Sequence, residues 1–205
     1  MSDWLHGVEV PPLIIKDIRR ITQNIRTATN VIKHHRYPIV ELLEFGMPQV
    51  IDNFDWEVVD VLGEGREACC FPDGCQSHPQ GPKIVLTNRV YEEATKGDGR
   101  SRYTIAHEIG HVFLHRNIPP VHNRKRCGSD LNPWENSEWQ ANTFAGELLM
   151  PIESFNRHKT LPTFCSEMGV SRQAARTQGF KFIKRKELSN THWIRKEGGL
   201  DMDTG

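Results

Sequence analysis

The sequence predicts an α+β fold for a chain of 205 residues. Short stretches rich in valine, tryptophan and cysteine predict strands in the middle of the chain, and helical periodicities precede and follow them. The length fits one ordinary domain with a small appendage. We therefore expect residues 1–158 to form the core with an N-terminal helix, residues 159–196 a small helical appendage, and residues 197–205 a flexible tail.

The first predicted element is an amphipathic helix over residues 13–34. Its apolar residues recur at steps of three and four, which places one stripe on a single helical face: Ile14, Ile18, Ile21, Ile25, Ala28 and Ile32. A shorter helix is expected from Ile39 to Phe45, because Pro38 precedes it and Gly46 is a helix-stop signal.

Three strands are predicted between the early helices and the second half of the chain. The first is Phe54–Leu62, rich in valine and tryptophan. The second is Glu67–Phe71, closed by the turn signal Pro72-Asp73-Gly74, and the third is Lys83–Thr87. We expect Lys83–Thr87 to lie at an edge of the sheet, where an extended peptide could bind by β-augmentation.

The second half of the chain is predicted to be mainly helical. An apolar stripe indicates a helix over 101–115, and a polar loop is expected over 116–131. The next helix ends near Pro151, and its start is indicated by a cap, a first-turn proline and a capping-box glutamate: Asn132, Pro133 and Glu135. Two short helices, about 163–168 and 172–178, follow, with Gly169 closing the first and Ser171 capping the second.

Composition excludes several classes of protein. With 26 basic and 26 acidic side chains the formal net charge is zero, which argues against whole-surface attraction to nucleic acid or an anionic membrane. The longest apolar runs are too short for a membrane span, and the N-terminus lacks the features of a signal peptide. Five cysteines, an odd count, favour reduced thiols in a cytoplasm. The unusual feature is a surplus of histidine, with 10 residues.

Two of these histidines belong to the motif His107-Glu108-Ile109-Gly110-His111. Residues four apart lie on the same face of a helix, so two imidazoles placed in this way can bind one Zn²⁺ ion. Glu108 is rotated about 100° from His107. It can therefore take a proton from a metal-activated water and pass it to a leaving amine.

A third ligand is expected from the helix that follows. Glu138 there would complete a three-ligand catalytic site with an open position for water, and Asn142, one turn along, could hydrogen-bond a liganding histidine. Other third-ligand candidates are Glu135, Glu147, His115 and His122. Of these, Glu135 is better explained as a cap, and His115 as a buried or ligand-supporting histidine. His122 or Tyr103 could stabilise a tetrahedral oxyanion. The plain alternative is a helix that merely carries two surface histidines.

Two blocks of sequence resemble those of a known family. Residues 102–111, Arg-Tyr-Thr-Ile-Ala-His-Glu-Ile-Gly-His, resemble the RxTxAHExGH block of the ImmA/IrrE metallopeptidases. Residues 138–151 resemble that family's ExxANxFAxxLLMP block. The resemblance covers roughly residues 13–180, and it implies a zincin-like core in which a small antiparallel sheet packs beside the motif helix. It also implies Glu138 as the third zinc ligand.

The same resemblance implies a biological role. ImmA/IrrE proteins act in bacteria, phages and mobile elements, and typically relieve repression by cleaving a helix-turn-helix repressor that is often encoded nearby. It therefore implies a cytoplasmic zinc endopeptidase of narrow specificity, with one catalytic zinc ion and a protein substrate. The alternative is a non-proteolytic antirepressor that sequesters its partner and uses zinc only structurally.

Two weaker signals remain open at this point. Four residues could hold a second metal, although their spacing is not standard and reduced strand cysteines explain them as well: Cys69, Cys70, Cys75 and His78. Residues 163–178 resemble a helix-turn-helix, and residues 172–196 carry eight basic residues against the single acid Glu187. We expect this region to pack on the core. The other interpretations are a surface for the repressor and, least favoured, direct nucleic-acid contact.

Overall fold

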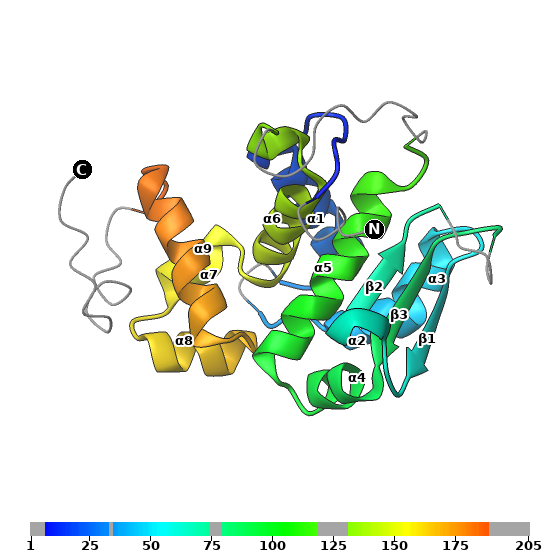
Figure 1. Cartoon of the computed structure of the whole chain (residues 1–205). Helices are drawn as coiled ribbons and strands as arrows, with labels where there is room; N and C mark the ends of the chain where they lie inside the picture. The colour runs from blue at the N-terminus through cyan, green and yellow to red at the C-terminus, as the bar shows by residue number, and fades with distance from the viewer. Residues whose placement is uncertain (1–6, 33–34, 74–78, 119–130, 189–205) are drawn as a thin grey trace.

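The computed structural model describes residues 7–32, 35–73, 79–118 and 131–188. A small sheet lies at one side of the molecule, and two long helices, α5 (Gly99–His115) and α6 (Ser137–Leu149), run through its middle. At the opposite side are α7 (Ile152–Arg157), α8 (Leu161–Met168) and α9 (Arg172–Lys184) (Figure 1). The predicted α+β fold class is confirmed. Within these described ranges, no helix combines the length and apolar character needed to span a bilayer.

The sheet has the strand order β1-β3-β2. The central strand β3 (Lys83–Thr87) runs parallel to β1 (Asp55–Val59) and antiparallel to β2 (Ala68–Phe71). The sheet is therefore mixed, which corrects the antiparallel sheet implied by the family resemblance. The chain reverses after β1 and again after β2, and β3 then enters between the two earlier strands, so it has the direction of β1.

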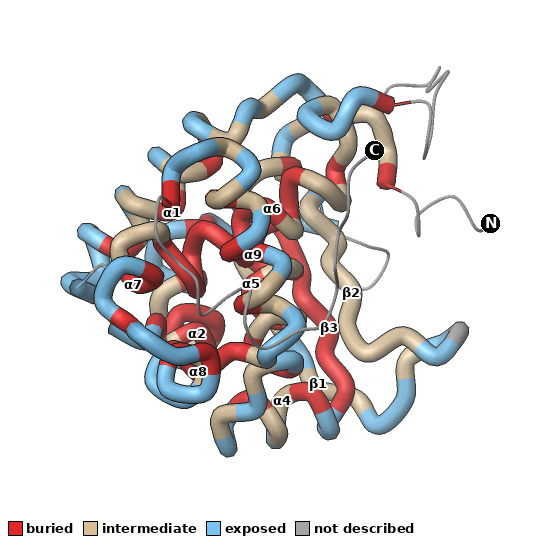
Figure 2. Tube along the Cα trace, turned by 90° about the vertical axis from the view of Figure 1, so that its left-hand side faces the viewer, coloured by how far each residue is buried: buried red, intermediate tan, exposed pale blue. Residues whose placement is uncertain are grey.

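Strand β3 is the interior strand of this sheet, so the prediction that Lys83–Thr87 is an edge strand is wrong. All five of its residues are buried, whereas β2 is only partly buried (Figure 2). Both sides of β3 already pair with backbone, which leaves no free main-chain groups for an added strand. The strand that lies along α5 with a free edge among the described residues is β2.

The N-terminal helix α1 spans Ile15–Ala28 and is shorter than predicted. Asn30 adopts a left-handed conformation with φ of 54° just beyond it, which ends the helix. Ile14 and Ile32, predicted on the buried face, are 51% and 55% exposed because they lie outside the helix. Inside the helix, Arg26 is almost completely buried and donates hydrogen bonds to three carbonyl oxygens, including that of Leu148 at the end of α6.

The helical segment after Pro38 continues past the predicted stop at Gly46. It consists of α2 (Ile39–Glu41), a π-helical turn η2 (Leu42–Gly46) and α3 (Met47–Val50). Gly46 serves packing here, since a Cβ at this position would lie 2.7 Å from Leu42 Cδ1.

Two helices have no counterpart in the sequence predictions, whereas the C-terminal pair was predicted, although α9 continues to Lys184, past its predicted end at 178. The unpredicted helices are α4 (Asn88–Thr95), capped by Thr87 Oγ1, and the short α7. Between α8 and α9, Gly169 closes the first helix with φ of 61°, and the Ser171 hydroxyl accepts a hydrogen bond from the Ala174 N–H. Both of these capping predictions are confirmed.

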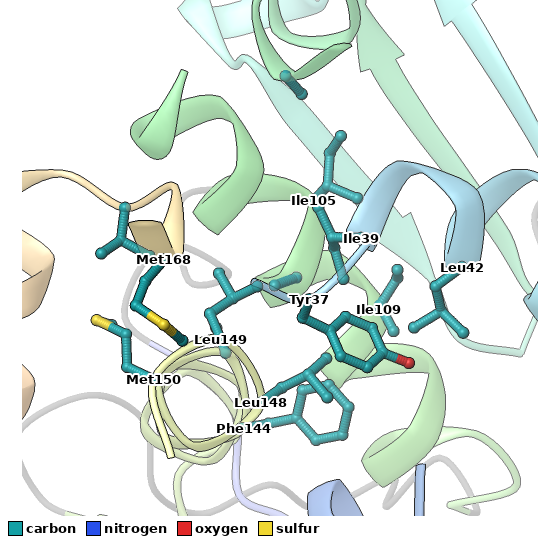
Figure 3. Close-up of a cluster of buried hydrophobic side chains, with 14 of the residues drawn as sticks. Tyr37, Ile39, Leu42, Ile105, Ile109, Phe144, Leu148, Leu149, Met150 and Met168 are labelled. Atoms are coloured by element: carbon teal, nitrogen blue, oxygen red, sulfur yellow. The ribbon is translucent and has the colours of Figure 1, made fainter. Parts of the chain in front are cut away.

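The core lies where α5 and α6 pack against the segment that leads into α2 (Figure 3). Ile105 and Ile109 of α5 face Tyr37 and Ile39, and α6 closes the cluster with three fully buried apolar side chains: Phe144, Leu148 and Leu149. Burying one such side chain stabilises a fold by about 1.5–3 kcal/mol. This packing fixes α5 and α6 against each other, and both helices carry the candidate site.

The C-terminal helices are joined to this core by close contacts. A Cβ on Gly99, at the start of α5, would lie 2.3 Å from the Val170 carbonyl carbon, so glycine lets the turn between α8 and α9 touch the helix. Arg102 is buried beside this turn and donates to the carbonyl oxygens of Gly169 and Tyr37. On the other side, the buried Glu147 of α6 forms an ion pair with Arg19 of α1.

Candidate metal centre

Helix α5 brings the motif histidines to one face. The helix begins after Gly97, which has φ of 98°, and the Asp98 carboxylate caps it by accepting a hydrogen bond from the Ser101 N–H at 2.7 Å. Hydrogen bonds from Ser101, first of all from its backbone N–H, favour the charged form, so the pKa of Asp98 lies below its usual range. The apolar residues of α5 face the core, and His107 and His111 lie one turn apart on another face.

Helix α6 supplies Glu138 from its first turn. The N-cap of this helix is Asn136, whose side-chain oxygen accepts a hydrogen bond from the Trp139 N–H at 3.0 Å. The predicted cap at Asn132 is wrong, because Pro133–Glu135 forms a separate 3-10 turn, η5, before the helix. Local capping preferences alone do not distinguish a 3-10 turn from the first turn of the helix. The Glu135 carboxylate accepts a hydrogen bond from the Asn132 side chain, so it folds back onto the start of η5.

A glycine determines how closely α5 and α6 approach at this point. A Cβ on Gly110 would lie 3.0 Å from Phe144 Cδ1 and 3.3 Å from the Cα of Ala141. A larger residue would therefore require the Phe144 ring or the α6 backbone to move by a few tenths of an ångström. The glycine in the motif thus serves the site directly, because it lets the imidazoles of α5 reach a carboxylate on α6.

Three ligand atoms converge between the two helices. His107 Nε2 lies 3.1 Å from one carboxylate oxygen of Glu138, and His111 Nε2 lies 3.2 Å from the other. The two Nε2 atoms are 3.0 Å apart. Zinc bonds of about 2.0–2.1 Å at tetrahedral angles separate ligand atoms by roughly 3.3 Å. The cluster therefore fits a metal ion such as zinc with little adjustment, and it is the only group of this kind among the residues that the structure describes.

The electrostatics of the cluster keep the Glu138 carboxyl group ionised beside the two imidazoles. Burial alone would raise the pKa of Glu138, but hydrogen bonds from His107 and His111 lower it well below the usual range. Burial alone would lower the pKa of His107, but its contact with Glu138 and the nearby Glu108 carboxylate raise it. Glu138 is thus an anion held against two imidazoles, which is the charge pattern of a divalent cation site.

Glu108 lies beside the cluster and is not part of it. Its residue is 8% exposed, and burial raises the pKa of its carboxyl group, partly offset by the two histidines. The same carboxyl group contributes to the raised pKa of the Cys70 thiol on β2, after the larger effect of burial. A buried carboxyl with a raised pKa, between metal ligands and a strand edge, has the properties of a general base.

The comparisons with known proteins agree with this geometry. The model of the IrrE N-terminal-like domain, a peptidase family, matches residues 73–177, slightly more than half of the chain. The chain belongs to this family. Helices α5 and α6, with all the residues of the cluster, lie inside the matched segment of the IrrE N-terminal-like domain. The ImmA/IrrE resemblance of the two sequence blocks is thereby confirmed.

One solved structure is similar to this chain in its fold. A Mycobacterium tuberculosis transcriptional regulator matches with a TM-score of 0.51 and 16% sequence identity. The match covers 78% of this chain and 45% of the regulator, so this chain spans less than half of that protein's length. At this identity the likeness concerns the fold. No curated protein matches the sequence significantly.

The structure also places Tyr103, Asn142 and Glu147, which were predicted as further candidates for the site. Tyr103 donates from its hydroxyl to the Asn142 carbonyl oxygen at 2.9 Å, and burial raises its pKa to about 12. The Asn142 side chain donates to the carbonyl of Glu138 and makes a smaller contribution to the raised pKa of His107. Glu147 is paired with Arg19 on another side of α6. His122 lies outside the described residues, as do Cys75 and His78 of the second possible metal cluster.

His115 is buried and contacts His111. The two Nδ1 atoms are 2.9 Å apart, and His115 Nε2 lies 3.1 Å from the side-chain oxygen of Gln140. Burial, with a further contribution from His111, lowers the pKa of His115 to about 4, so its ring is neutral near pH 7. That His115 supports a ligand stays a prediction, whereas the sequence pattern did not indicate Gln140.

A groove borders the cluster on the side of α9. It has a volume of about 590 Å³ and is lined by Glu138, Asn142 and Tyr103 together with Thr177 and Lys181 of α9. A second hollow of about 620 Å³ shares Tyr103, Thr177 and Lys181 with it and continues toward the start of α5. The C-terminal helix therefore forms one wall of the space next to the metal ligands. The sequence indicated a basic surface here but not its position beside the site.

Proposed function

We propose that this chain is a zinc-dependent endopeptidase of narrow specificity, with His107, His111 and Glu138 as metal ligands and Glu108 as catalytic base. The observation that carries the proposal is the convergence of three ligand atoms beside a separate buried carboxyl group. Two imidazoles and one carboxylate form the usual protein ligand set of a catalytic zinc ion, with a further position open for water or substrate.

The protein's own groups perform the proton transfers of peptide hydrolysis. Bound zinc would supply a Lewis acid that polarises the peptide carbonyl and acidifies water. Glu108 takes the proton of the attacking water and delivers it to the leaving amine nitrogen, so the same carboxyl acts first as base and then as acid. Its buried position and raised pKa suit both roles.

The substrate is best accommodated between β2 and the groove at α9. Among the described residues β2 is an outer strand of the sheet and lies along the motif helix, so an extended peptide can add to the sheet at this strand. β2 thus replaces Lys83–Thr87 in the predicted role. On the other side, the groove that Glu138 lines has Lys181 as its basic residue. A peptide held at both places passes the metal ligands in an extended conformation.

The proposed substrate is a helix-turn-helix repressor encoded near this chain. Family membership supports the proposal, since the ImmA/IrrE peptidases typically relieve repression in this way. Cleavage would derepress a phage, mobile-element or stress operon in the bacterial cytoplasm. The basic surface of α9 would then contact the partner protein, and direct binding of nucleic acid is not part of the proposal.

The test is coexpression with the neighbouring repressor. We expect wild-type protein to cut it, and Glu108→Gln to keep one zinc ion per chain but lose cleavage. Glu92→Gln, an exposed glutamate on α4, is the matched control and should keep both properties. Cleavage by Glu108→Gln at the wild-type rate would refute the assigned base. A stable, uncut complex with wild-type protein would refute the peptidase and favour the antirepressor, with zinc in a structural role.

A further inference from the structure

The N-terminal segment of the chain lies against the beginning of α6. Its backbone pairs with the residues around η5: Val10 N–H donates to the Glu135 carbonyl and Leu13 N–H to the Trp134 carbonyl, each at 2.9 Å. The Ser137 N–H donates to Val8 at 3.0 Å. This pairing places the Pro11 carbonyl oxygen next to the buried side chain of Gln140, 129 residues away in sequence.

The surroundings of Gln140 determine the orientation of its amide group. Nε2 lies 2.9 Å from the Pro11 carbonyl oxygen and 2.7 Å from the Trp134 carbonyl oxygen. Carbonyl oxygens only accept hydrogen bonds, so the atom facing them must be the NH₂ group. The opposite orientation would set three oxygens against one another inside the protein. The side-chain oxygen of Gln140 therefore faces His115, at 3.1 Å from Nε2.

This orientation determines the hydrogen positions on the next two rings. The Gln140 oxygen only accepts, so His115 Nε2 must carry a hydrogen, and in a neutral ring His115 Nδ1 then has the lone pair. His111 Nδ1, 2.9 Å from that atom, must be the donor. With a hydrogen on Nδ1, His111 binds a metal through Nε2, which is the atom that lies beside Glu138 and His107.

We propose that Gln140 and His115 are positioning residues that hold His111 in the Nδ1–H tautomer for metal binding. The Pro11 carbonyl oxygen orients Gln140, so the backbone of the N-terminal segment contributes indirectly to the metal centre. The inference rests on the proposed zinc site and is independent of which peptide is cleaved. Neither residue is itself proposed as a metal ligand. Both act through the orientation and tautomer of His111.

The first test measures zinc affinity by competition with a chromophoric chelator. Gln140→Met removes the amide at similar size, and His115→Phe removes the ring nitrogens. Each should weaken zinc binding by about 10–100-fold, the usual effect of losing such a supporting group. His115→Gln can still accept from His111 and donate to Gln140, so it should restore most of the affinity. Equal affinities of His115→Gln and His115→Phe would overturn the proposal.

The matched control is Gln178→Met, which removes another buried amide, on α9 beside Glu147 and two helical turns along α6 from Gln140. It should leave zinc affinity at the wild-type value, and thermal melts should show that each variant is folded. An equal loss of affinity in Gln178→Met and Gln140→Met would assign the effect to general core damage and overturn the proposal. If the wild-type protein itself binds no zinc, the proposed function fails together with the proposed roles of Gln140 and His115.

The second readout is the ring tautomer, independent of activity. Long-range ¹⁵N–¹H correlation spectra of the zinc-loaded protein distinguish Nδ1–H from Nε2–H in each histidine. We expect His115 to carry its hydrogen on Nε2 in the wild type, and this signal to change in Gln140→Met but not in Gln178→Met. A hydrogen on His115 Nδ1 in the wild type would overturn the proposal, whatever the affinities are.

Discussion

The close approach of α5 and α6 at Gly110 gives a quantitative test of how the site is built. Gly110→Ala adds one methyl group between the helices. Its carbon would lie 3.0 Å and 3.2 Å from two ring atoms of Phe144 and 3.3 Å from the Cα of Ala141. Optimal carbon contacts are about 3.5–4.0 Å. Phe144 is fully buried and stacks on Phe113 with ring centroids 5.8 Å apart, so its ring has little room to move.

Two opposing contributions set the stability change of Gly110→Ala. Alanine is favoured over glycine inside a helix by about 1 kcal/mol. Overpacking of a tight core contact costs about 1–3 kcal/mol. The net result is a loss of about 1 kcal/mol, or a fall in Tm of roughly 2–4 °C for a chain of this size. The larger effect is expected on zinc, because separating α5 from α6 moves Glu138 away from both imidazoles, and we expect affinity to fall about tenfold or more.

The assay combines a thermal melt with zinc titration against a chelator. Gly63→Ala is the matched control, because a Cβ there meets no atom within 4 Å and the residue has no positive φ. It should leave zinc affinity unchanged and Tm equal or slightly higher. If Gly110→Ala instead melts higher and binds zinc as wild type does, then the helix spacing does not control the site, and the reasoning is refuted.

Three further predictions concern other parts of the structure. His107→Ala should lose stoichiometric zinc in elemental analysis; retained metal would contradict its assignment as a ligand. Glu147→Gln should lower the free energy of unfolding by about 3 kcal/mol in denaturant titration, because it breaks a buried pair with Arg19, while zinc stays bound. Asp98→Ala should cost about 1 kcal/mol at pH 7. Folding lowers the pKa of Asp98, so the difference in unfolding free energy between wild type and Asp98→Ala should be present above the ordinary carboxyl pKa. It should disappear as pH falls through the lower pKa of the folded state. A pH-independent difference in urea titrations would contradict the cap.

The sequence predicted the parts of the site that depend on local geometry. His107 and His111 follow from helical spacing, and the strands Glu67–Phe71 and Lys83–Thr87 agree with the structure to within a residue. Gly169 and Ser171 were predicted because left-handed turns and N-caps are local chemistry. These features need only a few neighbouring residues to form, so a single sequence carries enough information to predict them.

The features that the sequence did not predict depend on distant contacts. The interior position of β3 results from strand order, which nothing in Lys83–Thr87 itself encodes. Gln140 has a function only because a segment 129 residues away presents a carbonyl to it. Lys181 lines the groove because the turn that leads into α9 contacts the start of α5. Local periodicity describes each helix correctly and is silent about which helix it meets.

Glu138 and Glu147 show how neighbours determine the role of one residue type on one helix. Nine residues at about 100° each place the two carboxylates on opposite sides of α6. Glu147 is 1% exposed and already paired with the guanidinium of Arg19, which satisfies its charge with fixed protein donors. Glu138 is 32% exposed, borders the groove and faces two imidazoles, which bind a metal when they are neutral. The Glu147 carboxylate is neutralised by arginine and therefore joins helices. The Glu138 carboxylate faces neutral nitrogen ligands beside solvent, so its charge stays available for a cation. Of the two, only Glu138 is suited to bind a metal.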